Sequence, residues 1–207
     1  MRRMRVEALV ADAQGKHQAA LRHCQMALTL AEASAVDRYR LLIMSDMAWT
    51  HQMGRAETAV TSFHDLLFHL DDTVRQGLAR AHATCGLTVA LIAAGRIDDA
   101  SHAALRAVRT LQQANLLRSR SEVFAWLAAA LGDMATAAIL LGVGESFLRS
   151  SETERDPISA LARVRALELI EAGMPDDDRQ HWGRQGSDVG EAELVHMLTN
   201  TFSAVGQ

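Results

Sequence analysis

The sequence predicts an all-α protein, a right-handed α-solenoid of four stacked helical hairpins followed by C-terminal capping helices. Alanine and leucine dominate the 207 residues, 49% of which are hydrophobic, and β-branched residues are sparse. This composition favours helices. A glycine followed by an alanine five residues later also recurs at nearly even spacing, and small or apolar residues continue each copy at helical intervals. Such repeats are typical of stacked helical pairs.

The glycine–alanine step occurs four times, in GKHQAA, GRAETA, GRIDDA and GDMATA, and the glycines are 39, 41 and 37 residues apart. Glycine ends a helix cheaply because it tolerates positive φ. The small residue five positions later lets the following helix approach closely. Positions nine and twelve residues after each glycine are small or apolar in all four copies, as an inward helix face requires. These patterns predict turns between paired helices at Gly15, Gly54, Gly95 and Gly132.

The elements follow in order from these turns. The first complete helix is expected over 17–33, and Asp37 can cap the next one. The second hairpin then carries inward apolar residues that include Phe63, Leu66 and Leu67. The spacing Ser119-x-x-Glu122 is a capping-box pattern and predicts the start of a further helix there.

A long apolar segment, residues 123–144, is the strongest membrane candidate because it has the length to span a bilayer. Asp133 stands in its middle, where insertion would cost roughly 2.5–3.5 kcal/mol. Gly132 also occupies the recurring turn position, which favours two buried helices joined by a turn. At the N-terminus, Glu7 and Asp12 interrupt what would be the apolar part of a signal peptide. We therefore expect a soluble protein.

The residues after the repeats are predicted to close the solenoid. We expect one continuous domain, with four hairpins over 1–149 and a loop and helical cap over 150–207. Asp156-Pro157 has the order of an N-cap and a first helical residue, and the helix it opens should end at Gly173. A final helix is expected after a cap formed by Asp188 and Glu191.

Charge and cysteine usage exclude several classes of protein. The net charge of −4 argues against a dedicated nucleic-acid binder or a basic membrane-surface protein. Cys24 and Cys85 are too few for a disulfide scaffold and lack metal-ligand spacing, so we expect small buried side chains in a reducing cytoplasm.

Nine histidines invite a catalytic or metal-binding interpretation. His17 and His23 are six residues apart and His64 and His69 are five apart, whereas a helical H-E-x-x-H site needs a spacing of four. A step of five residues turns by about 140° around a helix, so such side chains diverge. We therefore expect no catalytic residue, no metal site and no cofactor. An enzyme that uses these histidines stays the least favoured alternative.

The repeats resemble the tetratricopeptide (TPR) family, although their length near 40 residues exceeds its unit of 34. That length resembles the helical sensor regions of large bacterial transcription regulators of the LuxR/MalT and AfsR kinds. Their last hairpin typically reads GD-x-x-x-A-A-x-L-L-G-A-A-E, which is matched here by Gly132, Asp133, Ala137, Ala138, Leu140, Leu141, Gly142 and Glu145. Their closing segment is matched more loosely, by Trp182, Arg184, Ser187, Glu191 and Ala192.

The resemblance implies a non-catalytic scaffold that binds a protein or a small-molecule effector and takes part in signal transduction. It implies no direct contact with nucleic acid or membrane, and it leaves a homo-oligomer open. The ATPase and DNA-binding modules of such regulators are not recognisable here, because the lysine of Gly15-Lys16-His17 lacks the rest of a Walker A loop. The chain is accordingly expected to be either the C-terminal piece of a regulator or a stand-alone relative. The alternative function is a free-standing TPR adaptor or chaperone that binds protein segments.

Aligning the glycines predicts which side chains of the first helix in each pair face the binding groove. The groove so predicted is mostly apolar, with two histidines and one acid. An equally good interpretation places several of the same residues in the core between repeats. The predicted groove residues are Met44, Ala48, His51, His82, Cys85, Val89, Glu122 and Trp126.

Overall fold

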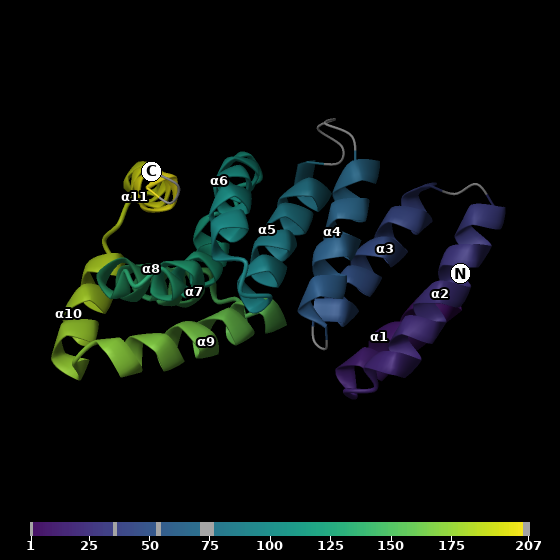
Figure 1. The fold of residues 1–207 in the computed structure, drawn as a ribbon, viewed down its shortest axis with the longest axis horizontal. Coiled ribbons are helices and arrows are strands. Elements are labelled where there is room, and N and C mark those ends of the chain that lie inside the picture. The colour runs from purple at the N-terminus through teal and green to yellow at the C-terminus, as the bar shows by residue number, and fades with distance from the viewer. Residues whose placement is uncertain (1, 35–36, 53–54, 71–76, 205–207) are drawn as a thin grey trace. The chain divides into compact units, whose positions relative to one another are not determined.

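The computed structural model describes residues 2–34, 37–52, 55–70 and 77–204. Throughout these ranges the chain forms helices and short connections, without a β-strand. This confirms the predicted all-α class. The chain divides into two compact units, Met1–Ala94 and Gly95–Gln207, which Figure 1 colours from purple to teal and from teal to yellow.

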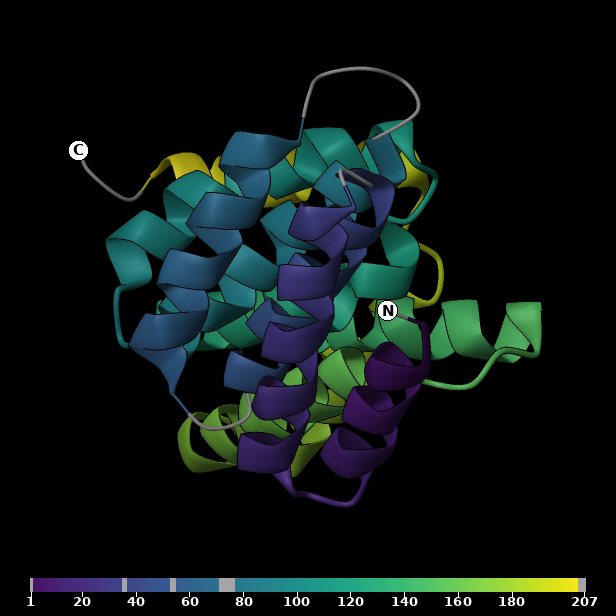
Figure 2. The ribbon, with the colours of Figure 1, turned by 90° about the vertical axis from the view of Figure 1, so that its right-hand side faces the viewer.

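The first unit is a row of helices in which each packs on the next. Both views show α1 lying alongside α2 (Figures 1 and 2). The T-shaped contact between Trp49 and Phe63, with ring centroids 4.8 Å apart, joins α3 to α4. The helices are α1 (Arg2–Ala13), α2 (His17–Ala33), α3 (Asp37–Gln52), α4 (Ala56–His69) and α5 (Gly77–Ala93).

The second unit combines a helical hairpin with the helices that cover it. α7 and α8 form the hairpin, α9 packs on α7, α10 packs on α8, and α11 packs on α6 and α7. The boundary expected between repeats and cap, at residues 149 and 150, falls within α8. The elements are α6 (Ile97–Gln113), the 3₁₀ helix η2 (Arg118–Arg120), α7 (Ser121–Ala130), α8 (Met134–Ser151), α9 (Pro157–Gly173), α10 (Asp176–Gly186) and α11 (Glu191–Ser203).

The inward positions deduced from the repeats are confirmed. All twelve residues found five, nine and twelve positions after the four glycines are buried, with exposed fractions between 0% and 6% for the eleven that have side chains. They lie along one face of α2, α4, α6 and α8, because steps of four and three residues return to the same side of a helix. The set is Ala20, Cys24, Ala27, Ala59, Phe63, Leu66, Ala100, Ala104, Ala107, Ala137, Leu141 and Gly144.

Three of the repeat glycines lie between helices with positive φ. The angles are 71° at Gly15, 72° at Gly95 and 86° at Gly132. An added Cβ at these positions would meet no atom within 4 Å, so backbone conformation rather than space is what favours glycine there. Gly54, the fourth predicted turn, lies outside the described residues.

The apolar segment 123–144 is divided as predicted. α7 ends at Ala130 and α8 begins at Met134, where the Asp133 side chain accepts a hydrogen bond from the Thr136 amide. No helix in the described ranges combines the length and apolar character needed to cross a bilayer.

The local signals of the second unit had mixed outcomes. Asp156 caps α9 by accepting hydrogen bonds from the amides of Ile158 and Ser159, and α9 ends at Gly173, as predicted. The capping box is wrong, because residues 118–120 form η2 and the Ser119 hydroxyl donates to the Leu116 carbonyl. The predicted cap of the last helix is also wrong: Gly190 is the N-cap of α11, and no side chain caps it.

Candidate functional site

A basic cleft of about 530 Å³ lies in the first unit, where the α1–α2 connection and the start of α2 meet the end of α3 and the start of α4. Figure 1 shows the α1–α2 connection at the lower end of this row of helices. We call it the basic cleft. It is lined by Gly15, Lys16, His17, Gln18, Ala19, Leu21, Arg22, Thr50, His51 and Arg55.

The charge of the basic cleft is one-sided. Lys16, Arg22 and Arg55 are exposed cations, and no aspartate or glutamate stands among the lining residues. Among the described residues, the carboxylate of Asp12 is bonded to this lining, with its Oδ1 2.8 Å from His17 Nδ1. The cleft is therefore a positive region on a protein whose overall charge is negative.

Two helix N-termini lie at the basic cleft. α2 begins at His17 and α4 at Ala56, and neither has a side-chain cap. The N-terminal end of a helix carries a positive partial charge because its first amides lack helical partners. Lys16 and Arg55 themselves occupy the N-cap positions, where serine, threonine, aspartate or asparagine would usually supply a hydrogen-bond acceptor. The first turn of α4 also holds Glu57, whereas that of α2 holds no acid, so the start of α2 is the end that favours a negatively charged ligand.

His51 is a half-buried polar residue of the basic cleft. Its Nδ1 lies 2.9 Å from Ser62 Oγ, and that hydroxyl donates to the Thr58 carbonyl 3.0 Å away. Because the hydroxyl has one hydrogen, His51 Nδ1 is the donor in this pair and Nε2 is left as the acceptor. Burial first, and then the charge of Arg55, lowers the pKa of His51 below its ordinary value, so the ring is neutral at pH 7.

The predicted groove residues divide into buried and half-buried side chains. Ala48, Cys85, Val89, Glu122 and Trp126 are buried, which corresponds to the alternative of a core between helices. Met44, His51 and His82 are half-buried. Of the eight, only His51 lines the basic cleft. A binding role for Met44 and His82 stays a prediction.

Glu122, the predicted acidic residue of the groove, is instead the centre of an ion cluster. Its side chain is 3% exposed, and both of its oxygens accept from Arg155 Nε, at 2.9 and 3.0 Å. Arg155 Nη2 also donates to Glu145 Oε1 at 2.9 Å, and Arg163 Nη1 lies 2.8 Å from the same oxygen. Burial raises the pKa of Glu122, although Arg155 opposes this shift. Through Arg155, Glu122 of α7 is thus linked to Glu145 of α8.

A second acid, Asp46, stands where the TPR pattern has a large apolar residue. Its two oxygens accept from Nε and Nη2 of Arg5, at 2.5 and 3.2 Å, so that α3 is joined to α1 by a forked ion pair. The sequence held no signal for this pair or for the partners of Glu122, because the residues are far apart in the chain.

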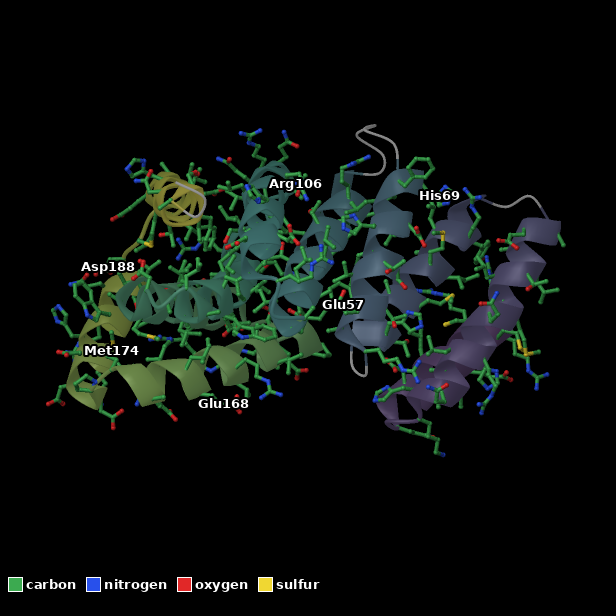
Figure 3. All side chains as sticks on the ribbon, in the orientation of Figure 1. Glu57, His69, Arg106, Glu168, Met174 and Asp188 are labelled. Carbon is green, nitrogen blue, oxygen red and sulfur yellow. The ribbon has the colours of Figure 1, made fainter. Side chains whose placement is uncertain are left out.

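The structure brings no metal ligands together in the described part of the chain, where no group of three or more His, Cys, Asp or Glu side chains could hold an ion. His64 and His69 are both exposed on α4. Figure 3 shows His69 at the upper end of α4, whereas the basic cleft lies at the other end, where α4 begins. Cys24 and Cys85 are buried and form no disulfide.

Comparison with solved structures identifies the fold. A crystal structure of nearly identical TPR-like repeats from Podosopora anserina, named for kinesin light chain, matches with a TM-score of 0.61 and 16% identity over 100% of this chain and 96% of that one. A variant of that protein matches with a TM-score of 0.62 and 15% identity over 98% and 96% of the two chains. No protein-family model and no curated protein matches the sequence. At this level of identity the likeness concerns architecture alone, and it shows that this chain has a TPR-like helical-repeat fold.

Proposed function

We propose that this chain is a non-catalytic TPR-like scaffold whose basic cleft docks an acidic segment of a partner protein. The observation that carries the proposal is the one-sided charge of the cleft. Lys16, Arg22 and Arg55 surround it without a lining carboxylate, and the uncapped N-terminus of α2 lies there. Complementary charge steers association and selects partners.

The neutral state of His51 refines the kind of partner. A charged imidazole would add to the attraction for any anion, but at pH 7 the ring offers Nε2 as an acceptor. Leu21 and Ala19 supply apolar surface beside the cations. An extended segment that alternates carboxylates with small or apolar residues meets these features, because its carboxylates pair with the cations, its backbone N–H groups can donate to Nε2 and its apolar side chains can cover Leu21 and Ala19.

Peptide binding provides the test. A fluorescein-labelled peptide of alternating glutamate and leucine should bind saturably in an anisotropy titration at low salt, and its lysine–leucine counterpart should not. Exchanging both Arg22 and Arg55 for glutamine should weaken binding by about tenfold, which corresponds to about 1.4 kcal/mol. Exchanging Arg2 and Arg3 for glutamine removes the same charge from α1, outside the cleft lining, and should leave binding nearly unchanged.

Two outcomes would overturn this assignment. One is the absence of saturable binding to the acidic peptide, with the parent chain folded by circular dichroism. The other is an equal loss of affinity in the two double variants, because general charge attraction would then explain the binding without the cleft.

The wider role that we propose is the C-terminal sensor and interaction region of a bacterial transcription regulator of the LuxR/MalT/AfsR kind, acting in the cytoplasm. The support is the sequence resemblance around the α7–α8 hairpin, where Gly132, Asp133 and the residues that follow match the regulators' last hairpin. The check is the coding sequence on either side of this segment. It should encode a P-loop ATPase or a helix-turn-helix module, and a coding sequence with neither would refute this role.

A further inference from the structure

An arginine-lined pocket of about 370 Å³ lies in the second unit, between α8, α9 and α10. We call it the arginine pocket. It belongs to a different unit from the basic cleft, and the inference drawn from it does not depend on the proposed peptide docking. Its charged lining consists of Glu145, Arg149, Arg163, Arg179 and Arg184.

Close packing of two helices forms the floor of the pocket. An added Cβ at Gly142 of α8 would collide with the carbonyl oxygen of Gly183 in α10. The two backbones therefore touch, and glycine is what permits it. This contact fixes where α10 crosses α8 and so where Arg179 and Arg184 stand relative to Arg149. The pocket is thus built by rigid backbone, while the arginines supply its chemistry.

The positive charge of the pocket is only partly neutralised. Arg163 shares Glu145 with Arg155, and Arg179 pairs with the exposed Asp176 at 2.9 Å. Arg149 and Arg184 are exposed, and within the described residues no carboxylate pairs with either. The pocket lining therefore has four guanidinium groups and one carboxylate, that of Glu145, which is already paired with Arg155 and Arg163.

Arg163 is anchored at the wall of the pocket by ion pairs. Its Nη1 atom is buried and lies 2.8 Å from Glu145 Oε1 and 3.7 Å from Glu122 Oε1. These contacts hold the Arg163 guanidinium in place, so among the described residues the positive charge that no acid offsets comes from Arg149 and Arg184.

We propose that the arginine pocket binds a small multivalent oxyanion, either a phosphate compound or a polycarboxylate. The planar fork of arginine matches the oxygens of both groups in two parallel hydrogen bonds. The volume falls in the range of small-molecule sites. A ligand held by Arg149 and Arg163 on one side and by Arg179 and Arg184 on the other would tie α10 to α8 and α9. α10 is otherwise a polar helix whose one buried residue is Gly186.

Calorimetric titration of the full chain with pyrophosphate and with citrate tests this site, with sodium chloride at matched ionic strength as the blank. We expect saturable binding at one site and a rise in the melting temperature, and the tighter of the two anions assigns the class of ligand. The double variant Arg149→Gln with Arg184→Gln should bind at least about tenfold more weakly. Both side chains are exposed, so this variant should fold like the parent chain.

The matched control is Arg165→Gln on α9. Arg165 pairs with Glu168 at 2.9 Å and does not line the pocket, and Figure 3 shows Glu168 on the side of α9 away from α8. This variant should bind like the parent chain. Absence of saturable binding by either anion, or the same loss in the control as in the double variant, would overturn the proposal.

Discussion

Two glycines three residues apart in α10 should respond differently to replacement by alanine. At Gly186, an added Cβ would collide with the Ile139 carbonyl oxygen and lie 2.9 Å from the Val143 amide nitrogen. At Gly183, the nearest atom would be the Ala138 carbonyl oxygen at 3.9 Å, an ordinary contact. The atoms that crowd Gly186 belong to the backbone of α8, so no side-chain rotation relieves them and α10 must move away.

The magnitudes follow from packing and helix propensity. Forced overpacking costs about 1–3 kcal/mol, and a rigid backbone contact belongs at the upper end of that range. Inside a helix, alanine is more favourable than glycine by up to about 1 kcal/mol. Replacing Gly183 should gain this stability in full, whereas replacing Gly186, the last residue of α10, should gain only part of it. Gly186→Ala should therefore lose about 2 kcal/mol of unfolding free energy, while Gly183→Ala should be neutral or slightly stabilising.

Urea denaturation at 25 °C, with circular dichroism and tryptophan fluorescence as parallel probes, measures this difference. In a chain of this size, about 2–3 kcal/mol separates the melting temperatures of the two variants by about 5–10 °C. Equal stability of the two variants would refute the inference that α8 and α10 meet through their backbones. It would also remove the rigid floor from the arginine pocket.

Three further predictions concern titratable groups that are buried or half-buried. Asp156→Ala should cost about 1–2 kcal/mol because it removes the α9 cap and the ion pair with Arg120. Burial alone would raise the pKa of Asp156, but Arg120 and Ser159 outweigh it and lower the pKa. The carboxylate's stabilisation is therefore present above about pH 4 and lost as the pH falls further, so the gap to the parent in thermal melts should shrink at pH 3. Glu122→Ala should lower the free energy of unfolding by about 2–4 kcal/mol in urea denaturation, because it removes the buried partner of Arg155. Glu122→Gln should lower it by less than half as much. Equal losses in the two variants would show that charge and hydrogen bonding at this position do not matter. Burial first, and then Asp46, raises the pKa of the Cys24 thiol to about 11. In a Cys85→Ala variant, Cys24 should therefore react with a thiol reagent at pH 8 only after the protein unfolds. Rapid labelling of the folded protein would contradict the burial of Cys24.

The features that the sequence predicted best are those with a period. The small residues that follow Gly15 and Gly95 at fixed intervals are buried, because a helix returns to the same face every three or four residues whatever it packs against. Asp156 and Pro157 were also predictable, since an N-cap needs only its own next residues. Local and periodic sequence patterns therefore predicted the structure correctly here, because they do not depend on contacts between distant residues.

The ionic contacts were beyond prediction for a physical reason. Asp46 meets Arg5 across 41 positions and Glu122 meets Arg155 across 33, so each pair exists only once the helices are placed. The misread capping box shows the same effect at short range. The Glu122 carboxylate accepts from Arg155, and the Ser119 hydroxyl donates to the Leu116 carbonyl, so neither side chain makes the bond that a capping box requires. A local pattern fails where a distant partner offers the stronger bond.

Gly132 and Gly142, both in the α7–α8 hairpin, have different structural roles. Gly132 has a positive φ and marks a turn, whereas Gly142 lies inside α8, where glycine costs about 1 kcal/mol relative to alanine. Its retention in a helix is explained by the contact with α10. The part of the sequence that most resembles the regulators thus encodes a helix crossing. Of its matched residues only Glu145 and Arg184 bring charge to the arginine pocket, and the other lining cations, Arg149, Arg163 and Arg179, lie outside the resemblance. Anion binding is therefore a property that follows from this chain's own arginines, and a shared tail fold would not by itself supply it.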